Sequence, residues 1–117
     1  MRDPVPLGAQ LQKGTTPLLV LSVIGDGELY GYQIAQLIRE RSDGVFVPSE
    51  GSLYPTLHRL EADGALVATW RENERGPKRR YYRLTPGGYR LLADHLAQWS
   101  AFAVSVRRVA LPEASGG

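Results

Sequence analysis

The C-terminal part of the chain carries apolar side chains at alternating intervals of three and four residues, the spacing of a helix with one apolar face. Thr85-Pro86 places a threonine cap before a proline at the first helical position, so we expect this helix to run from Pro86 to about Leu111. A chain of 117 residues is too small to cover so wide a stripe itself, and we expect the stripe to pack against a second copy. The predicted dimer interface comprises Leu92, Leu96, Trp99, Phe102, Ala103, Val106 and Val109.

Two shorter helices are predicted near the N-terminus. Thr15-Thr16-Pro17 again combines a threonine cap with a proline, and the residues after it are apolar as far as Ile24. A second helix is expected from about Tyr30 to Arg41, where apolar side chains repeat at helical spacing. Residues 1–12 hold two prolines and a glycine, so we expect them to form a flexible arm.

A third helix is predicted within Ser49–Asp63, because leucines recur there at helical spacing. A proline costs about 3 kcal/mol inside a helix but almost nothing in its first turn. Pro55 therefore favours Ser52 as the cap of this helix, with Ser49–Gly51 as a preceding turn. The apolar segment Val45-Phe46-Val47 before it is short enough to be a small strand.

A hairpin is predicted next, because apolar and polar side chains alternate over residues 66–71 and again over 81–84. The link from Glu72 to Pro77 is expected to form its turn. Three short helices, a hairpin and a long helix predict a mainly α chain with a small β-hairpin, that is, a winged helix-turn-helix with a C-terminal dimerisation helix. The expected regions are the arm (1–12), the winged helix-turn-helix (13–85), the dimerisation helix (86–111) and a disordered tail (112–117).

Positive charge is concentrated around the predicted hairpin. The whole chain has a net charge of +2, but residues 71–90 hold seven basic and two acidic side chains, a net charge of +5. A local basic patch on a mildly acidic body is typical of a surface that binds a polyanion. Composition alone leaves a solvated, charged hairpin as an equal alternative.

Two surfaces could contact such a polyanion. With its leucines buried, the third helix presents Ser52, Thr56 and Arg59, flanked by Tyr54, Pro55 and His58, and these side chains could reach phosphates or a guanine edge. An ordinary solvated helix face is the alternative. Lys78-Arg79-Arg80 is predicted at the root of the hairpin as a set of phosphate contacts, rather than as charges that prevent edge-to-edge strand pairing.

Trp99 lies in the middle of the apolar stripe on the last helix. It could be a core residue of the dimer interface, or it could line a pocket between subunits, with His95 and Phe102, for a planar aromatic ligand. Both interpretations stay open at this point.

Several classes of protein do not fit the sequence. The chain has no cysteine, which excludes disulfides, thiol catalysis and thiolate metal sites and suits the cytoplasm. We find no serine elbow, phosphate-binding loop, clustered acidic pair or metal motif, so we predict neither an enzyme nor a cofactor. No apolar run reaches the ~20 residues of a membrane span, and the N-terminus lacks the apolar core of a secretory signal.

Four motifs together resemble the PadR family of bacterial transcriptional regulators: Leu29-Tyr30-Gly31-Tyr32, Ser49-Glu50-Gly51-Ser52-Leu53-Tyr54-Pro55, Leu57-x-Arg59-Leu60-Glu61-x-x-Gly64 and Arg80-Tyr81-Tyr82-Arg83-Leu84-Thr85. The resemblance implies a homodimeric winged helix that usually represses transcription and is relieved by a small molecule. The single last helix resembles the short branch of the family, in which some members bind flat aromatic drugs between subunits beside a central tryptophan.

This resemblance and the residue patterns predict contacts with double-stranded DNA at a palindromic operator. The alternative is a winged-helix module that binds proteins and never DNA, but such a module would not need so basic a wing. The predicted DNA-binding residues are Tyr32, Ser49, Gly51, Ser52, Tyr54, Pro55, Thr56, His58, Arg59, Lys78, Arg79 and Arg80.

Overall fold

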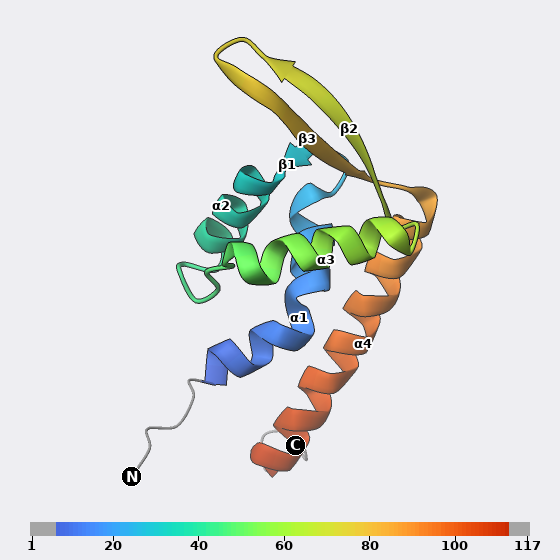
Figure 1. The fold of residues 1–117 in the computed structure, drawn as a ribbon. Helices are drawn as coiled ribbons and strands as arrows, with labels where there is room; N and C mark the ends of the chain where they lie inside the picture. Colours follow the sequence, from blue (N-terminus) through green and yellow to red (C-terminus); the bar gives the residue numbers. More distant parts are fainter. Residues whose placement is uncertain (1–6, 113–117) are drawn as a thin grey trace.

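The computed structural model of the chain describes residues 7–112 (Figure 1). It is built from four helices and a small antiparallel sheet, which is the mainly α, winged-helix architecture expected from the sequence. The elements in chain order are α1 (Leu7–Ile24), β1 (Leu29–Tyr30), α2 (Gly31–Arg41), α3 (Glu50–Ala62), β2 (Leu66–Asn73), β3 (Gly76–Leu84) and α4 (Pro86–Ala110).

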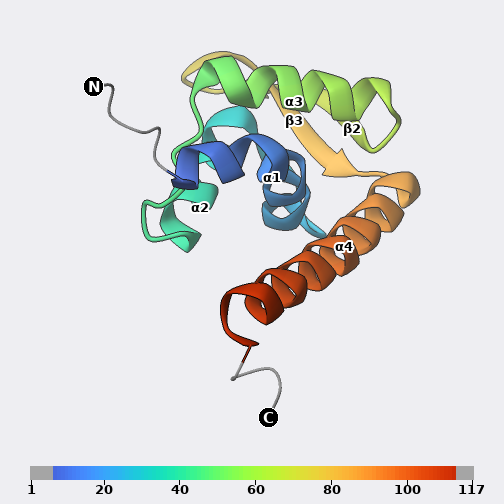
Figure 2. The same ribbon diagram turned by 90° about the horizontal axis from the view of Figure 1, so that it is seen from below.

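The hydrophobic core surrounds α1, which lies between α2, α3 and the start of α4 (Figure 2). Val20 and Leu21 of α1 are fully buried, together with Ile34 of α2 and Leu57 of α3. Complete burial of such a side chain contributes about 1.5–3 kcal/mol relative to its exposure. The core therefore fixes the relative positions of α2 and α3, the two helices of the helix-turn-helix.

The predicted start of the first helix is wrong. The helix begins at Leu7, so it covers residues 7–12 of the expected arm, while residues 1–6 lie outside the described part of the chain. Pro17 is inside the helix, where it removes one backbone donor, and α1 changes direction along its length (Figure 1). A proline marks either a helix start or a kink, and here it marks a kink.

The predicted cap of α3 is also wrong. Ser49, not Ser52, is the cap: the Ser52 N–H donates to Ser49 Oγ (3.3 Å), and the Ser49 N–H donates to Ser52 Oγ (3.2 Å). This reciprocal pair stabilises a start one turn earlier than expected and leaves Pro55 inside the helix. The carbonyl that loses its donor to Pro55 is that of Gly51, which is exposed to water. Residues 45–47 form an irregular connector, not a strand.

The sheet has three strands in the order β1–β3–β2, one more than predicted. The hairpin β2–β3, called the wing below, pairs from Leu66↔Leu84 to Asn73↔Gly76, so its turn is Glu74–Arg75 rather than residues 72–77. Lys78, Arg79 and Arg80 therefore lie along β3, not at the root of the hairpin. Short β1 joins the other edge of β3, with Tyr30 opposite Tyr81.

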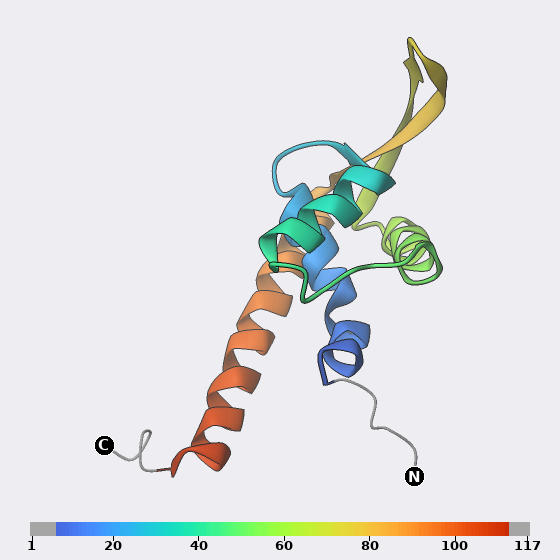
Figure 3. The same ribbon diagram turned by 90° about the vertical axis from the view of Figure 1, so that its left-hand side faces the viewer.

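The last helix begins as predicted, at Pro86 after the Thr85 cap, whose hydroxyl accepts a hydrogen bond from the Gly88 N–H (3.0 Å). Thr85 is the only residue between β3 and α4. Leu91 and Leu92 pack against the core, and the helix then runs away from the wing to the other end of the molecule (Figure 3). Most of the predicted stripe on α4 is consequently exposed in the single chain.

Candidate nucleic-acid interface

The face of α3 predicted to contact DNA is at the surface. Leu53, Leu57 and Leu60 are buried, which turns the other side of the helix outward. The predicted DNA-contacting side chains on α3 are exposed, except for Thr56, which is half-buried and donates its hydroxyl to the Ser52 carbonyl (2.9 Å). The exposed set is Ser52, Tyr54, Pro55, His58 and Arg59, together with Gly51.

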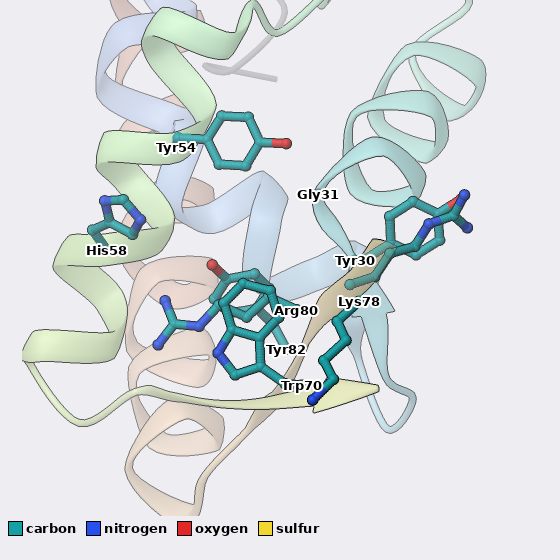
Figure 4. A pocket seen from close by; sticks show the side chains of 9 residues that line it. Tyr30, Gly31, Tyr54, His58, Trp70, Lys78, Arg80 and Tyr82 are labelled. Atoms are coloured by element: carbon teal, nitrogen blue, oxygen red, sulfur yellow. The ribbon is translucent and has the colours of Figure 1, made fainter. Parts of the chain in front are cut away.

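The wing and α3 face each other across a concave surface that encloses a pocket with a volume of ≈ 390 Å³ (Figure 4). Tyr54 and His58 come from α3, and side chains of the wing stand opposite them. Its lining mixes cationic and aromatic groups, a combination that suits both phosphates and the flat faces of bases. The lining residues are Tyr30, Gly31, Tyr54, His58, Trp70, Lys78, Arg79, Arg80 and Tyr82.

The three consecutive basic residues of β3 have different surroundings. Lys78 and Arg79 are exposed, and the Arg79 guanidinium lies 4.5 Å from the centre of the Tyr30 ring. Arg80 instead forms a 2.6 Å ion pair with Glu61 near the end of α3. Strand alternation turns Arg79 to the opposite face of the sheet from Lys78 and Arg80, and of the latter two it is Arg80 that pairs with Glu61. Only Lys78 and Arg79 therefore match the expected open phosphate contacts.

A second ion pair holds the opposite face of the wing. Arg71 of β2 lies 2.6 Å from Glu28 in the loop before β1, and its guanidinium is 5.1 Å from the centre of the Tyr81 ring. Arg71 remains more than half exposed, so this pair contributes at most about 1 kcal/mol. The wing is thus tied to the body of the protein on both faces.

Other residues named from the sequence lie at the edge of this surface. Tyr32 is exposed at the start of α2 and stacks against Tyr30 at 6.4 Å between ring centres, whereas the Ser49 hydroxyl is engaged in capping α3. Gly31 is packed so closely that a Cβ there would lie 2.9 Å from the Tyr54 hydroxyl.

Sequence reasoning missed part of the lining, namely Tyr30, Gly31, Trp70 and Tyr82. Tyr30 and Gly31 lie within the family motifs, which was a usable signal for those two. Trp70 and Tyr82 come together only through the pairing of β2 with β3, where they face the same side of the sheet.

The exposed side chains on α4 include the residues assigned to dimerisation and to an effector. Trp99 is 48% exposed, Phe102 61% and Val109 84%, while Leu96 and Val106 are exposed to a similar degree as Trp99. Ala103 and His95 are half-buried. Leu92 packs partly against the chain's own core, so it is less available to a partner than the sequence implies.

Two further properties bear on the class of protein. Among the described residues, no group of histidine, aspartate and glutamate side chains is arranged to hold a metal ion. No helix within residues 7–112 combines the length and the apolar character needed to cross a bilayer.

The short helix-turn-helix, the paired wing and the long terminal helix define a winged-helix transcriptional regulator. Comparison with known families gives the specific group, since residues 20–94 match the model described as the transcriptional regulator PadR-like family. The chain belongs to this family. Its members are transcriptional regulators and not enzymes.

Individual relatives agree with this assignment. The chain is 42% identical over 85 residues to the transcriptional regulator Rv3488 of Mycobacterium tuberculosis. The aligned region covers 73% of this chain and 76% of that protein. A PadR family regulator from Eggerthella lenta superposes with a TM-score of 0.76 at 32% identity, over 88% of both chains. A transcriptional regulator from Clostridium thermocellum gives a TM-score of 0.78 at 28% identity, over 85% of this chain and 96% of that one.

Proposed function

We propose that this regulator binds double-stranded DNA as a homodimer at a palindromic operator, with one α3 and one wing from each subunit on each half-site. The observation that supports this most strongly is the position of the polar face of α3 and the basic wing on either side of one concave surface. Binding to a bacterial operator would place its activity in the cytoplasm.

The proposed contacts follow from side-chain chemistry. The exposed start of α3 enters the major groove, where Ser52 and Tyr54 bond phosphates and Arg59 donates two hydrogen bonds to a guanine. Lys78 and Arg79 of the wing neutralise phosphates of the flanking backbone without reading bases. The groove contacts supply specificity, and the wing supplies affinity that depends on salt.

The dimer in this proposal forms through α4. Trp99, Phe102 and Val106 leave an apolar stripe in water when the chain is alone, and pairing with a second α4 removes it. A two-fold DNA site needs both subunits, because each α3 reads only one half-site. Dimerisation and operator binding are therefore expected to fail together.

We also propose that the protein acts as a repressor and that a small planar aromatic effector relieves repression by binding beside Trp99 at the dimer interface. The exposed indole of Trp99 and the nearby exposed ring of Phe102 support a stacking site. Simple packing of Trp99 against the partner helix is the alternative interpretation.

Titration with DNA at two salt concentrations tests the main proposal. Duplexes are first selected by the purified protein from a random-sequence pool, and affinity is then compared with a scrambled duplex of equal composition. We expect a preference for the selected duplex of at least about 10³-fold and a steep loss of affinity with salt. A chain that binds neither duplex would contradict the proposal and favour the alternative, a winged helix that binds proteins.

A further inference from the structure

One ion pair joins the proposed recognition helix directly to the wing. Arg80 Nη2 of β3 lies 2.6 Å from Glu61 Oε2 of α3, and the two side chains are only 32% and 29% exposed. Glu61 follows Arg59, the proposed base-contacting residue, by two positions on α3. Glu61 is therefore on the same helix as the proposed groove contacts, and Arg80 links it to the wing.

Arg80 is enclosed rather than extended toward solvent. Its guanidinium lies 6.0 Å from the Trp70 ring and 5.7 Å from the Tyr82 ring, and Trp70 is its cross-strand partner (Figure 4). Its Nε is buried and has no hydrogen-bond partner among the described residues. A guanidinium held by a carboxylate and two rings is not free to neutralise a phosphate.

We propose that Arg80 and Glu61 are positioning residues that set the distance between α3 and the wing and thereby the specificity of DNA binding. The inference rests on the proposed DNA-binding function and assigns Arg80 a role different from Lys78 and Arg79. Sequence-specific binding needs α3 and the wing to engage the groove and the backbone at once, whereas non-specific binding needs only positive charge. Loss of the pair therefore reduces specific binding more than non-specific binding.

The substitution E61Q separates this role from simple electrostatics. Removing a negative charge from a DNA-facing surface would by itself strengthen binding to every duplex. A positioning role predicts the opposite for the selected duplex: binding weaker by roughly three- to ten-fold, while binding to the scrambled duplex is unchanged or stronger. R80M is expected to lower the ratio of selected-duplex affinity to scrambled-duplex affinity. It should change the slope of log affinity against log salt by less than the value of about 1 expected for one lost phosphate contact.

E28Q is the matched control, because it also removes one acid and one wing ion pair but leaves the contact with α3 intact. The exchange variant E61R/R80E restores the opposite charges and is expected to recover part of the preference for the selected duplex. Circular dichroism and thermal melting establish that each variant is folded.

The experiment compares the ratio of selected to scrambled affinity for the wild type, E61Q, R80M, E61R/R80E and E28Q at two salt concentrations. The inference is overturned if E61Q strengthens binding to both duplexes equally. It is also overturned if R80M leaves the affinity ratio unchanged and lowers the slope of log affinity against log salt by about 1, as one lost phosphate contact would. A wild type without any preference for the selected duplex would instead refute the proposed function, so the two failures are distinguishable.

Discussion

The Tyr89 hydroxyl of α4 donates a 2.9 Å hydrogen bond to Asp26 Oδ1 in the loop between α1 and β1. The same loop holds Glu28, which pairs with Arg71 of the wing. Residues 26–28 thus connect the proposed dimerisation helix and the wing through two polar contacts. The hydrogen bond to Asp26, together with desolvation and the charge of Asp26, raises the pKa of Tyr89.

This raised pKa predicts a specific loss of stability in alkali. The folded state holds the Tyr89 proton more tightly than the unfolded chain, in which tyrosine titrates near pH 10. The contribution of the bond is therefore complete below about pH 10 and is lost as the pH rises through the higher folded-state pKa. Urea unfolding across this range should show a smaller decline for Y89F than for the wild type; parallel declines would contradict the assignment.

The wing substitution R79A should weaken binding to the selected and scrambled duplexes by similar factors. Arg79 is exposed and rests on the Tyr30 ring, and the proposed function assigns it a phosphate contact rather than a base contact. The slope of log affinity against log salt should fall by about 1, as expected for one lost phosphate contact. Selective loss of binding to the selected duplex would mean that the wing reads bases.

A charge on the apolar face of α4 should separate the proposed dimer. In F102K an ammonium group replaces a ring that is 61% exposed in the single chain, and its burial between helices would cost several kcal/mol. Sedimentation equilibrium should then show a folded or partly folded monomer at micromolar concentration. A101K is the control, because Ala101 lies on the other side of the helix from Trp99; dissociation of both variants alike would place the interface elsewhere.

Substitution of Gly88 should destabilise the protein, because a Cβ there would overlap the Ala65 carbonyl oxygen. We expect G88A to lower the free energy of unfolding by about 2 kcal/mol or more, since backbone must move to make room. G14A is the matched control: nothing lies within 4 Å of its Cβ position, and alanine should stabilise α1 by about 0.5–1 kcal/mol. Denaturation at equal protein concentration compares the free energies of unfolding of the two variants.

Dye titration distinguishes a ligand pocket at Trp99 from simple packing. A planar aromatic cation that stacks on Trp99 should quench indole fluorescence at micromolar concentration in the wild type and in W70F, but not in W99A. Bound dye should also lower the affinity for the selected duplex by the factor by which DNA lowers dye affinity. Binding that survives in W99A, or is lost in both variants, would leave Trp99 as an interface residue only.

Local patterns predicted the elements of this fold better than their ends and contacts. The Thr85 cap and the spacing of the α4 stripe were sufficient for the last helix, because both are local signals. Pro17 and Pro55 misled the assignment of helix starts, since a proline inside a helix and one at its first turn look alike in sequence.

The contacts that distinguish the basic residues could not be predicted in the same way. Arg80 pairs with Glu61, which is 19 residues away, and Tyr89 with Asp26, which is 63 residues away. No helix or strand periodicity in the sequence relates residues at these separations. Three adjacent cations therefore look equivalent in sequence, although strand alternation turns Arg79 to the opposite face from Lys78 and Arg80. The packing of the wing beside α3 distinguishes Arg80, which pairs with Glu61, from Lys78, which is exposed.

Thr85 alone separates β3 from α4, so a movement of the helix is transmitted directly to the strand. A tilt of roughly 5° about the middle of this 25-residue helix displaces its first residue by about 1.6 Å. With no loop to absorb that displacement, β3 has to move with the helix or pull against its pairing with β1 and β2. A small rotation at the far end of the molecule would thus be converted into a shift larger than the roughly 0.5 Å range of donor–acceptor distances that a hydrogen bond at a base edge tolerates.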